Sequence, residues 1–79
     1  MPMRQYTCTR IREGDEGDPQ VIGAPDPESA ARYLIAEQES RWCEYSVASG
    51  NETAIVDIKD HGQFEVSGVN HPQYVARRR

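Results

Sequence analysis

One segment, residues 26–41 with the sequence DPESAARYLIAEQESR, combines a helical repeat with a marked start, and it limits the possible folds more than any other part of the chain. Asp26 can cap this helix because its carboxylate accepts hydrogen bonds from the free amides of the first turn. Pro27 suits the first helical position, where a missing amide hydrogen costs nothing, and Glu28 complements the helix dipole. A stripe then recurs at three- and four-residue spacing: Ala30, Ala31, Leu34, Ile35 and Gln38. An amphipathic helix this short needs a packing surface, which the rest of the chain must supply.

Segments with the composition or the two-residue alternation of strands flank this helix on both sides. The turns between the last three segments are short, and short turns join only antiparallel neighbours. The sequence therefore predicts an α+β fold with the order ββαβββ, in which a single antiparallel sheet has one helix packed across one face. The predicted strands are residues 3–12, 20–24, 42–48, 54–59 and 64–67.

A chain of 79 residues makes one domain, which we place at residues 1–69. Residues 70–79 contain Pro72 and end in three arginines, so we expect a C-terminal tail that can dock back through Tyr74 and Val75. A chain this short buries only about 60–65% of its unfolded surface, and a partner or a second copy in a homodimer would add stability. The predicted core consists of the inward positions: Tyr6, Cys8, Ala31, Leu34, Ile35, Cys43, Tyr45, Val47, Ala54, Val56, Ile58, Phe64 and Val66.

The net charge of −4 conceals a division along the chain. All thirteen acidic residues lie between Glu13 and Glu65, where only three basic residues accompany them, so this body carries −10. An acidic body disfavours direct binding to nucleic-acid phosphate and favours a basic surface on a protein partner. The alternative is that the acids simply keep a small domain in solution. The two ends contribute +6 through six arginines: Arg4, Arg10, Arg12 and Arg77 to Arg79.

The sequence has no apolar run long enough to span a membrane, and its first eight residues lack the apolar core of a signal peptide, so we expect a cytoplasmic protein. Cys8 and Cys43 are too few for a disulfide scaffold and are expected to be small buried thiols. A zinc site made by these cysteines with His61 and His71 is disfavoured, because every gap is ten residues or more whereas structural ligands usually come in close pairs. We predict neither a metal nor a cofactor.

No spacing joins a serine or cysteine nucleophile to a histidine and an acid, and the sequence contains neither a phosphate-cradling glycine loop nor HExxH. We therefore predict no catalytic residues. The acidic loop over residues 13–19 lacks the residue order of a calcium loop, and it is either a docking loop for basic side chains or a solvated hairpin tip. Arg4, Arg10 and Arg12, with Tyr6 and the arginine tail, offer an alternative surface for RNA, although arginines on an edge strand also serve to block edge pairing.

A very short acidic chain with a strand pair ending in QVIGAPD, an ESAARYL helix and a closing meander resembles the small anti-CRISPR proteins of phages and other mobile elements, above all those that act on type I systems. The resemblance covers most of the chain, but it lies in the size, acidity and order of elements and not in a residue motif. No functional residue can therefore be assigned from it. It implies a non-enzymatic inhibitor that binds a Cas protein, a Cascade-type surveillance complex or its nuclease in the host cytoplasm. An acidic body suits this role because it can occupy a Lys/Arg surface meant for DNA phosphate.

The expected function is thus a protein-binding inhibitor of a nucleic-acid-handling complex, and the alternative is a small nucleic-acid-binding regulator that uses the strand arginines and the arginine tail. Carboxylates on the glycine-rich loop and on the strands are expected to steer and contact the partner. These predicted contact residues are Glu13, Asp15, Glu16, Asp18, Glu44, Asp57 and Glu65.

Overall fold

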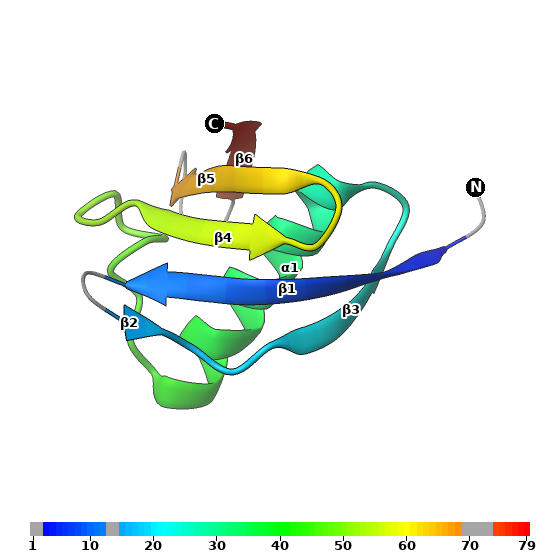
Figure 1. Cartoon of the computed structure of the whole chain (residues 1–79). Helices are drawn as coiled ribbons and strands as arrows, with labels where there is room; N and C mark the ends of the chain where they lie inside the picture. Colours follow the sequence, from blue (N-terminus) through cyan, green and yellow to red (C-terminus); the bar gives the residue numbers. More distant parts are fainter. Residues whose placement is uncertain (1–2, 13–14, 69–73) are drawn as a thin grey trace.

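An antiparallel sheet and one helix make up the part of the chain that the structure, a computed structural model, describes, namely residues 3–12, 15–68 and 74–79. β2 and β3 both pair with one edge of β1, while β4, β5 and β6 follow in turn from its other edge (Figure 1). The predicted α+β fold, with one helix across one face of a single antiparallel sheet, is confirmed. The elements are β1 (Arg4–Arg12), β2 (Asp15–Glu16), β3 (Gln20–Ala24), α1 (Pro27–Trp42), β4 (Ala54–Ile58), β5 (Gly62–Gly68) and β6 (Tyr74–Arg78).

The helix begins where the sequence predicts. The Oδ1 atom of Asp26 accepts a hydrogen bond from the backbone N–H of Ser29 at 2.7 Å, and Pro27 opens the first turn. The hydrogen bonds that Ser29 donates hold the pKa of the Asp26 carboxyl below its usual value. At the other end Cys43 adopts the left-handed conformation, with φ of 53°, and its N–H bonds back to the carbonyl of Glu39. This left-handed cap stops the helix one residue beyond the predicted end.

The position of the helix follows from the strand order. β3 and β4 are both antiparallel to β1 and lie on its opposite edges, so they run parallel to each other. Two parallel strands need a crossover connection rather than a hairpin. α1 makes this crossover behind the sheet in Figure 1, and it leaves the other face of the sheet uncovered by any described element.

The prediction of a strand over residues 42–48 is wrong. Trp42 ends α1, residues 46–50 form turns, and Cys43 and Tyr45 are exposed rather than part of the core. The physical reason is the carboxylate of Glu39, which is 3% exposed and accepts the backbone N–H groups of Val47 at 2.7 Å and Ala48 at 3.0 Å. These amides are therefore satisfied by a side chain instead of by a neighbouring strand, and Val47 alone of the three predicted core residues here is buried.

The C-terminal segment is the second correction. Residues 74–78, predicted as part of a tail that can dock back through Tyr74 and Val75, do dock, but as a strand, β6, that pairs with β5 from Phe64↔Arg78 to Gly68↔Tyr74. The hydroxyl of Tyr74 donates to Oε1 of Glu39 at 2.8 Å. The same carboxylate of α1 therefore binds both the turn at Val47 and Ala48 and the last strand. Apart from the two-residue β2, the predicted order ββαβββ is confirmed, because β6 supplies the strand that residues 42–48 do not form. The two-residue β2 also forms within the predicted acidic loop.

The core lies between α1 and the inward positions of the sheet. Its largest fully buried side chains include Phe64, Leu34, Ile35 and Ile58, all on the predicted core list. Ile22, Ala24 and Ala30 are also buried, although they were not predicted. Arg10 is buried too, because β1 alternates and Arg10 takes the inward position next after Tyr6 and Cys8.

Candidate functional site

The uncovered face of the sheet carries three of the seven carboxylates predicted to bind a partner. Strand register places Glu16 opposite Ile11, Ile11 opposite Ile55, and Ile55 opposite Glu65. Residues opposite one another in a sheet share a face, so these four side chains form a row across β2, β1, β4 and β5. Asp57 lies two residues along β4 from Ile55 on the same face. We call Ile11, Glu16, Ile55, Asp57 and Glu65 the open-face patch.

The open-face patch has an apolar middle and acidic ends. Ile11, Ile55 and Asp57 are half-buried, whereas Glu16 and Glu65 are exposed. With strands spaced about 4.8 Å apart, the three steps from Glu16 to Glu65 span about 14 Å. Arg77 on β6 lies opposite Glu65, so the two exposed glutamates have different electrostatic surroundings.

The other predicted carboxylates do not join this patch. Asp18 is exposed but lines a pocket on the helix side of the sheet. Glu44 is exposed after the end of α1, and the prediction that it projects from a strand is wrong. Asp15 belongs to β2 by its backbone, opposite Arg12, and Glu13 lies outside the described residues.

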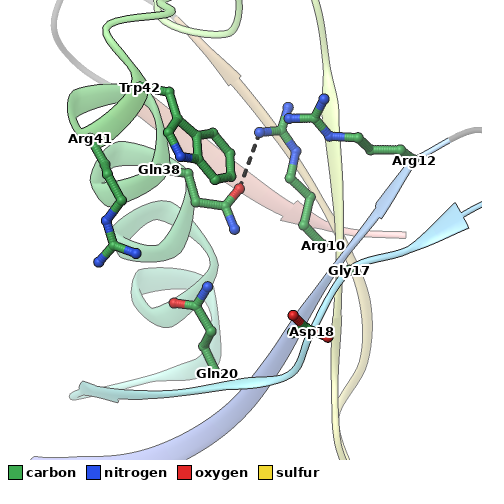
Figure 2. Close-up of a pocket in the computed structure, with 8 residues that line it drawn as sticks. All are labelled: Arg10, Arg12, Gly17, Asp18, Gln20, Gln38, Arg41 and Trp42. Carbon is green, nitrogen blue, oxygen red and sulfur yellow. Dashed lines mark hydrogen bonds between the residues drawn. The ribbon is translucent and has the colours of Figure 1, made fainter.

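The pocket lies between the sheet and the C-terminal turns of α1. Its volume is about 480 Å³, and Figure 2 shows side chains from β1, β3, the segment before β3 and α1 around it. The indole of Trp42 is 54% exposed and forms part of the wall. The lining residues are Arg10, Arg12, Gly17, Asp18, Gln20, Gln38, Arg41 and Trp42.

Arg10 is the buried cation of this pocket. It is 7% exposed, its Nη1 donates to Oε1 of Gln38 at 3.2 Å, and its Nη2 pairs with Oε1 of Glu52 at 3.4 Å. Burial lowers the pKa of the Arg10 guanidinium, and the nearby charge of Arg12 lowers it further, while Glu52 opposes both effects. The guanidinium is thus oriented by two partners and crowded by a second cation.

The remaining arginines of the predicted RNA surface do not converge with Arg10 and Arg12. Arg4 is at the exposed start of β1, and Arg77 falls on the uncovered face of β6. The guanidinium of Arg78 lies over the ring of Phe64, 4.9 Å from its centroid, and donates to the carbonyl of His61. The arginine that does join the pocket is Arg41, from the end of α1.

The cysteines and histidines are dispersed. Cys8 is fully buried, which raises the pKa of its thiol to about 11, whereas Cys43 is exposed, contrary to the prediction of two buried thiols. The ring of His61 meets that of Tyr6 edge-on at 5.2 Å, and His71 lies outside the described residues. Within the described ranges, no group of three or more His, Cys, Asp or Glu residues could hold a metal ion.

No family model, curated protein or solved structure matches this chain. The functional interpretation therefore rests on the geometry of the open-face patch and of the pocket. In the part of the chain that the structure describes, the helix is too short and too polar to cross a membrane.

Sequence reasoning found Arg10 and Arg12 but missed the pocket they line. Gln38 lies in the apolar stripe of the helix, and a polar residue at an inward position usually has a buried hydrogen-bond partner. Arg10 likewise lies at an inward position of an alternating strand. The inward placement of these two polar residues could have predicted the contact, because each is the other's hydrogen-bond partner. Trp42 and Arg41 carried no such signal, since both are exposed at the end of α1.

Proposed function

We propose that this chain is a non-enzymatic protein-binding inhibitor that covers a basic surface of a nucleic-acid-handling complex. The open-face patch is its contact surface. The observation that carries the proposal is the row on the uncovered face of the sheet, in which two isoleucines are bracketed by Glu16 and Glu65 with Asp57 beside them.

This arrangement supports the proposal through the usual anatomy of a protein interface, which has an apolar centre and a polar rim. Half-buried isoleucines on a sheet face gain from further burial, while exposed carboxylates at the rim lose little solvation when they meet lysine or arginine. Carboxylates about 14 Å apart can engage two separate basic side chains of a surface that otherwise holds nucleic-acid phosphate. Such charges act mainly on the rate of association and on the choice of partner.

The resemblance to anti-CRISPR proteins makes the proposal specific. It directs the test to the type I surveillance complex and its nuclease, both of which need basic surfaces to hold DNA. The test expresses the chain in a bacterium with an active type I system and measures transformation by a plasmid that carries the targeted sequence.

Wild-type chain should raise transformation to the level of a plasmid without the target. A variant with Glu16→Lys, Asp57→Lys and Glu65→Lys should leave the targeted plasmid restricted while unfolding at the same temperature as the wild type. A targeted plasmid that stays fully restricted in cells containing folded, soluble wild-type chain would refute the type I assignment.

A further inference from the structure

The pocket beside the end of α1 gathers a local positive charge on a molecule whose net charge is −4. Among the described residues, Arg10, Arg12 and Arg41 line it together with one acid, Asp18, so these four side chains carry +2. Figure 2 shows the guanidinium groups of Arg10 and Arg12 next to each other above the pocket, with the indole of Trp42 on the helix side. The charge is thus concentrated where the chain also presents an aromatic surface.

We propose that this pocket binds a nucleotide, with the phosphate held by Arg10 and Arg12 and the base against Trp42. This inference is independent of the proposed inhibitor function, because the pocket is on the helix side of the sheet and the open-face patch is on the other. A small ligand is suitable because about 480 Å³ lies within the range of small-molecule pockets.

The arginines favour phosphate over a simple carboxylate. A guanidinium presents a planar fork that matches two oxygens, so one arginine suffices for one carboxylate. Two adjacent guanidiniums suit a phosphate, which offers three oxygens and up to two negative charges. Arg10 is already oriented by Gln38 and Glu52, so less side-chain freedom is lost when the ligand arrives.

The same contacts favour an anion between these side chains. Arg10 is buried with a second cation close enough to lower its pKa. A bound phosphate would add to the compensation that Glu52 gives at 3.4 Å and that the charges of Glu39 and Glu44 also support. Arg41 pairs with Glu37 at 2.7 Å, but that pair is exposed on both sides, and exposed pairs of this spacing are weak enough to exchange for a ligand.

The rest of the lining fits the nucleoside. A half-exposed indole offers a flat surface on which any base can stack. Oε1 of Gln38 accepts from Arg10, which turns the amide so that Nε2 is left to donate towards the pocket, and Gln20 supplies a second amide from β3. Primary amides can both donate to and accept from a base edge, and the carboxylate of Asp18 can accept from a ribose hydroxyl as acids do in dinucleotide sites.

The test uses the fluorescence of Trp42, which is the only tryptophan in the sequence. The full chain is titrated with AMP, GMP, CMP and UMP, and in parallel with adenosine, inorganic phosphate and a short single-stranded oligonucleotide with and without a 5′-phosphate. At least one monophosphate should give saturable quenching with a Kd below about 1 mM. Adenosine and inorganic phosphate should each bind at least tenfold more weakly than the monophosphate.

Arg12→Gln is the main variant because Arg12 is exposed and its loss should not disturb the core. It should weaken nucleotide binding at least tenfold, and Trp42→Leu, followed by calorimetry, should do the same. Arg4→Gln is the matched control, since Arg4 lies on the same strand outside the pocket and should leave the affinity unchanged. Thermal unfolding of each variant shows whether the fold is retained.

If the 5′-phosphorylated oligonucleotide binds in an Arg12-dependent way while all free monophosphates fail to bind, the proposal still holds. The ligand is then the phosphorylated end of a nucleic-acid strand. The proposal is overturned if no nucleoside phosphate, free or in a strand, gives a saturable response. It is also overturned if inorganic phosphate or adenosine matches the nucleotide, or if Arg12→Gln and Trp42→Leu leave the affinity unchanged.

Discussion

Replacing Glu39 by alanine is expected to destabilise the fold by about 3–5 kcal/mol, because it leaves the buried groups that donate to this carboxylate without a partner. The carboxylate is 3% exposed and accepts from three donors, the N–H groups of Val47 and Ala48 and the hydroxyl of Tyr74. An unsatisfied buried amide costs about 1–3 kcal/mol, and the residues that carry both amides are at most 3% exposed. Since a chain of 79 residues has a total stability of about 4–12 kcal/mol, this variant approaches unfolding.

Urea denaturation followed by circular dichroism measures the change as a shift of the midpoint. Glu37→Ala is the matched control, because Glu37 lies two residues earlier on the exposed side of α1, where its pair with Arg41 contributes about 0.3–0.5 kcal/mol. If Glu39→Ala fails to fold, Tyr74→Phe still reports on the cluster and should cost about 1 kcal/mol. A loss below about 1 kcal/mol for a folded Glu39→Ala would refute the assignment of this carboxylate as the link between α1, the turn and β6.

Three further changes test the packing and titration of the same fold. Leu34→Ala should lower the free energy of unfolding by about 2–4 kcal/mol in urea, because Leu34 is fully buried, and a loss below about 0.5 kcal/mol would contradict its core position. Gly68→Ala should destabilise strongly in the same assay, since a Cβ at this position would collide with the carbonyl oxygens of Val47 and Ala48, and an unchanged midpoint would refute that close approach. Alkaline pH should destabilise the chain, because burial raises the pKa of Cys8 from 9.0 to about 11, so the thiol ionises first in the unfolded state. The contribution of the protonated Cys8 thiol to the free energy of unfolding is complete below pH 9.0. It falls by up to about 1.4 kcal/mol per pH unit towards pH 11. Cys8→Ala should flatten this part of the stability profile, and a profile identical to the wild type would contradict the account.

Local patterns were sufficient for much of the fold. The cap at Asp26 and the stripe through Leu34 and Ile35 located α1 to within a residue at each end, because these signals lie inside the helix itself. The alternation along β1 and β4 likewise identified both strands and their inward faces. Such features depend on residues close together in the sequence, so the sequence alone can determine them.

The errors occurred where distant residues decide the structure. Cys43, Tyr45 and Val47 alternate like a strand, but the choice of a turn depends on Glu39, eight residues before Val47. The basic segment over residues 74–78 became a strand because β5 offers a free edge and Tyr74 reaches Glu39 across 35 positions. Neither interaction leaves a periodic trace in the sequence.

The candidate sites show the same division. The sequence identified acidic residues but could not tell which of them would share a face. Strand register brings Glu16, Asp57 and Glu65 together, whereas Asp18 and Glu44 lie outside the strands. The pocket depends on the contact between the end of α1 and the sheet, so Arg41 and Trp42 could not be associated with Arg10 from spacing.

The most direct measurement of the central claim compares the binding of two charge-reversed variants to the purified type I complex or its nuclease. The open-face variant carries Glu16→Lys, Asp57→Lys and Glu65→Lys. The helix-side variant carries Glu28→Lys, Glu37→Lys and Glu44→Lys, so both variants change the net charge by the same amount.

The open-face variant should bind at least tenfold more weakly than the wild type, which corresponds to about 1.4 kcal/mol, and the helix-side variant should bind within about twofold of it. Added salt should weaken the wild-type complex mainly through its rate of association. Equal affinities for the wild type and a folded open-face variant, at low salt, would contradict the claim that this face of the sheet binds the partner.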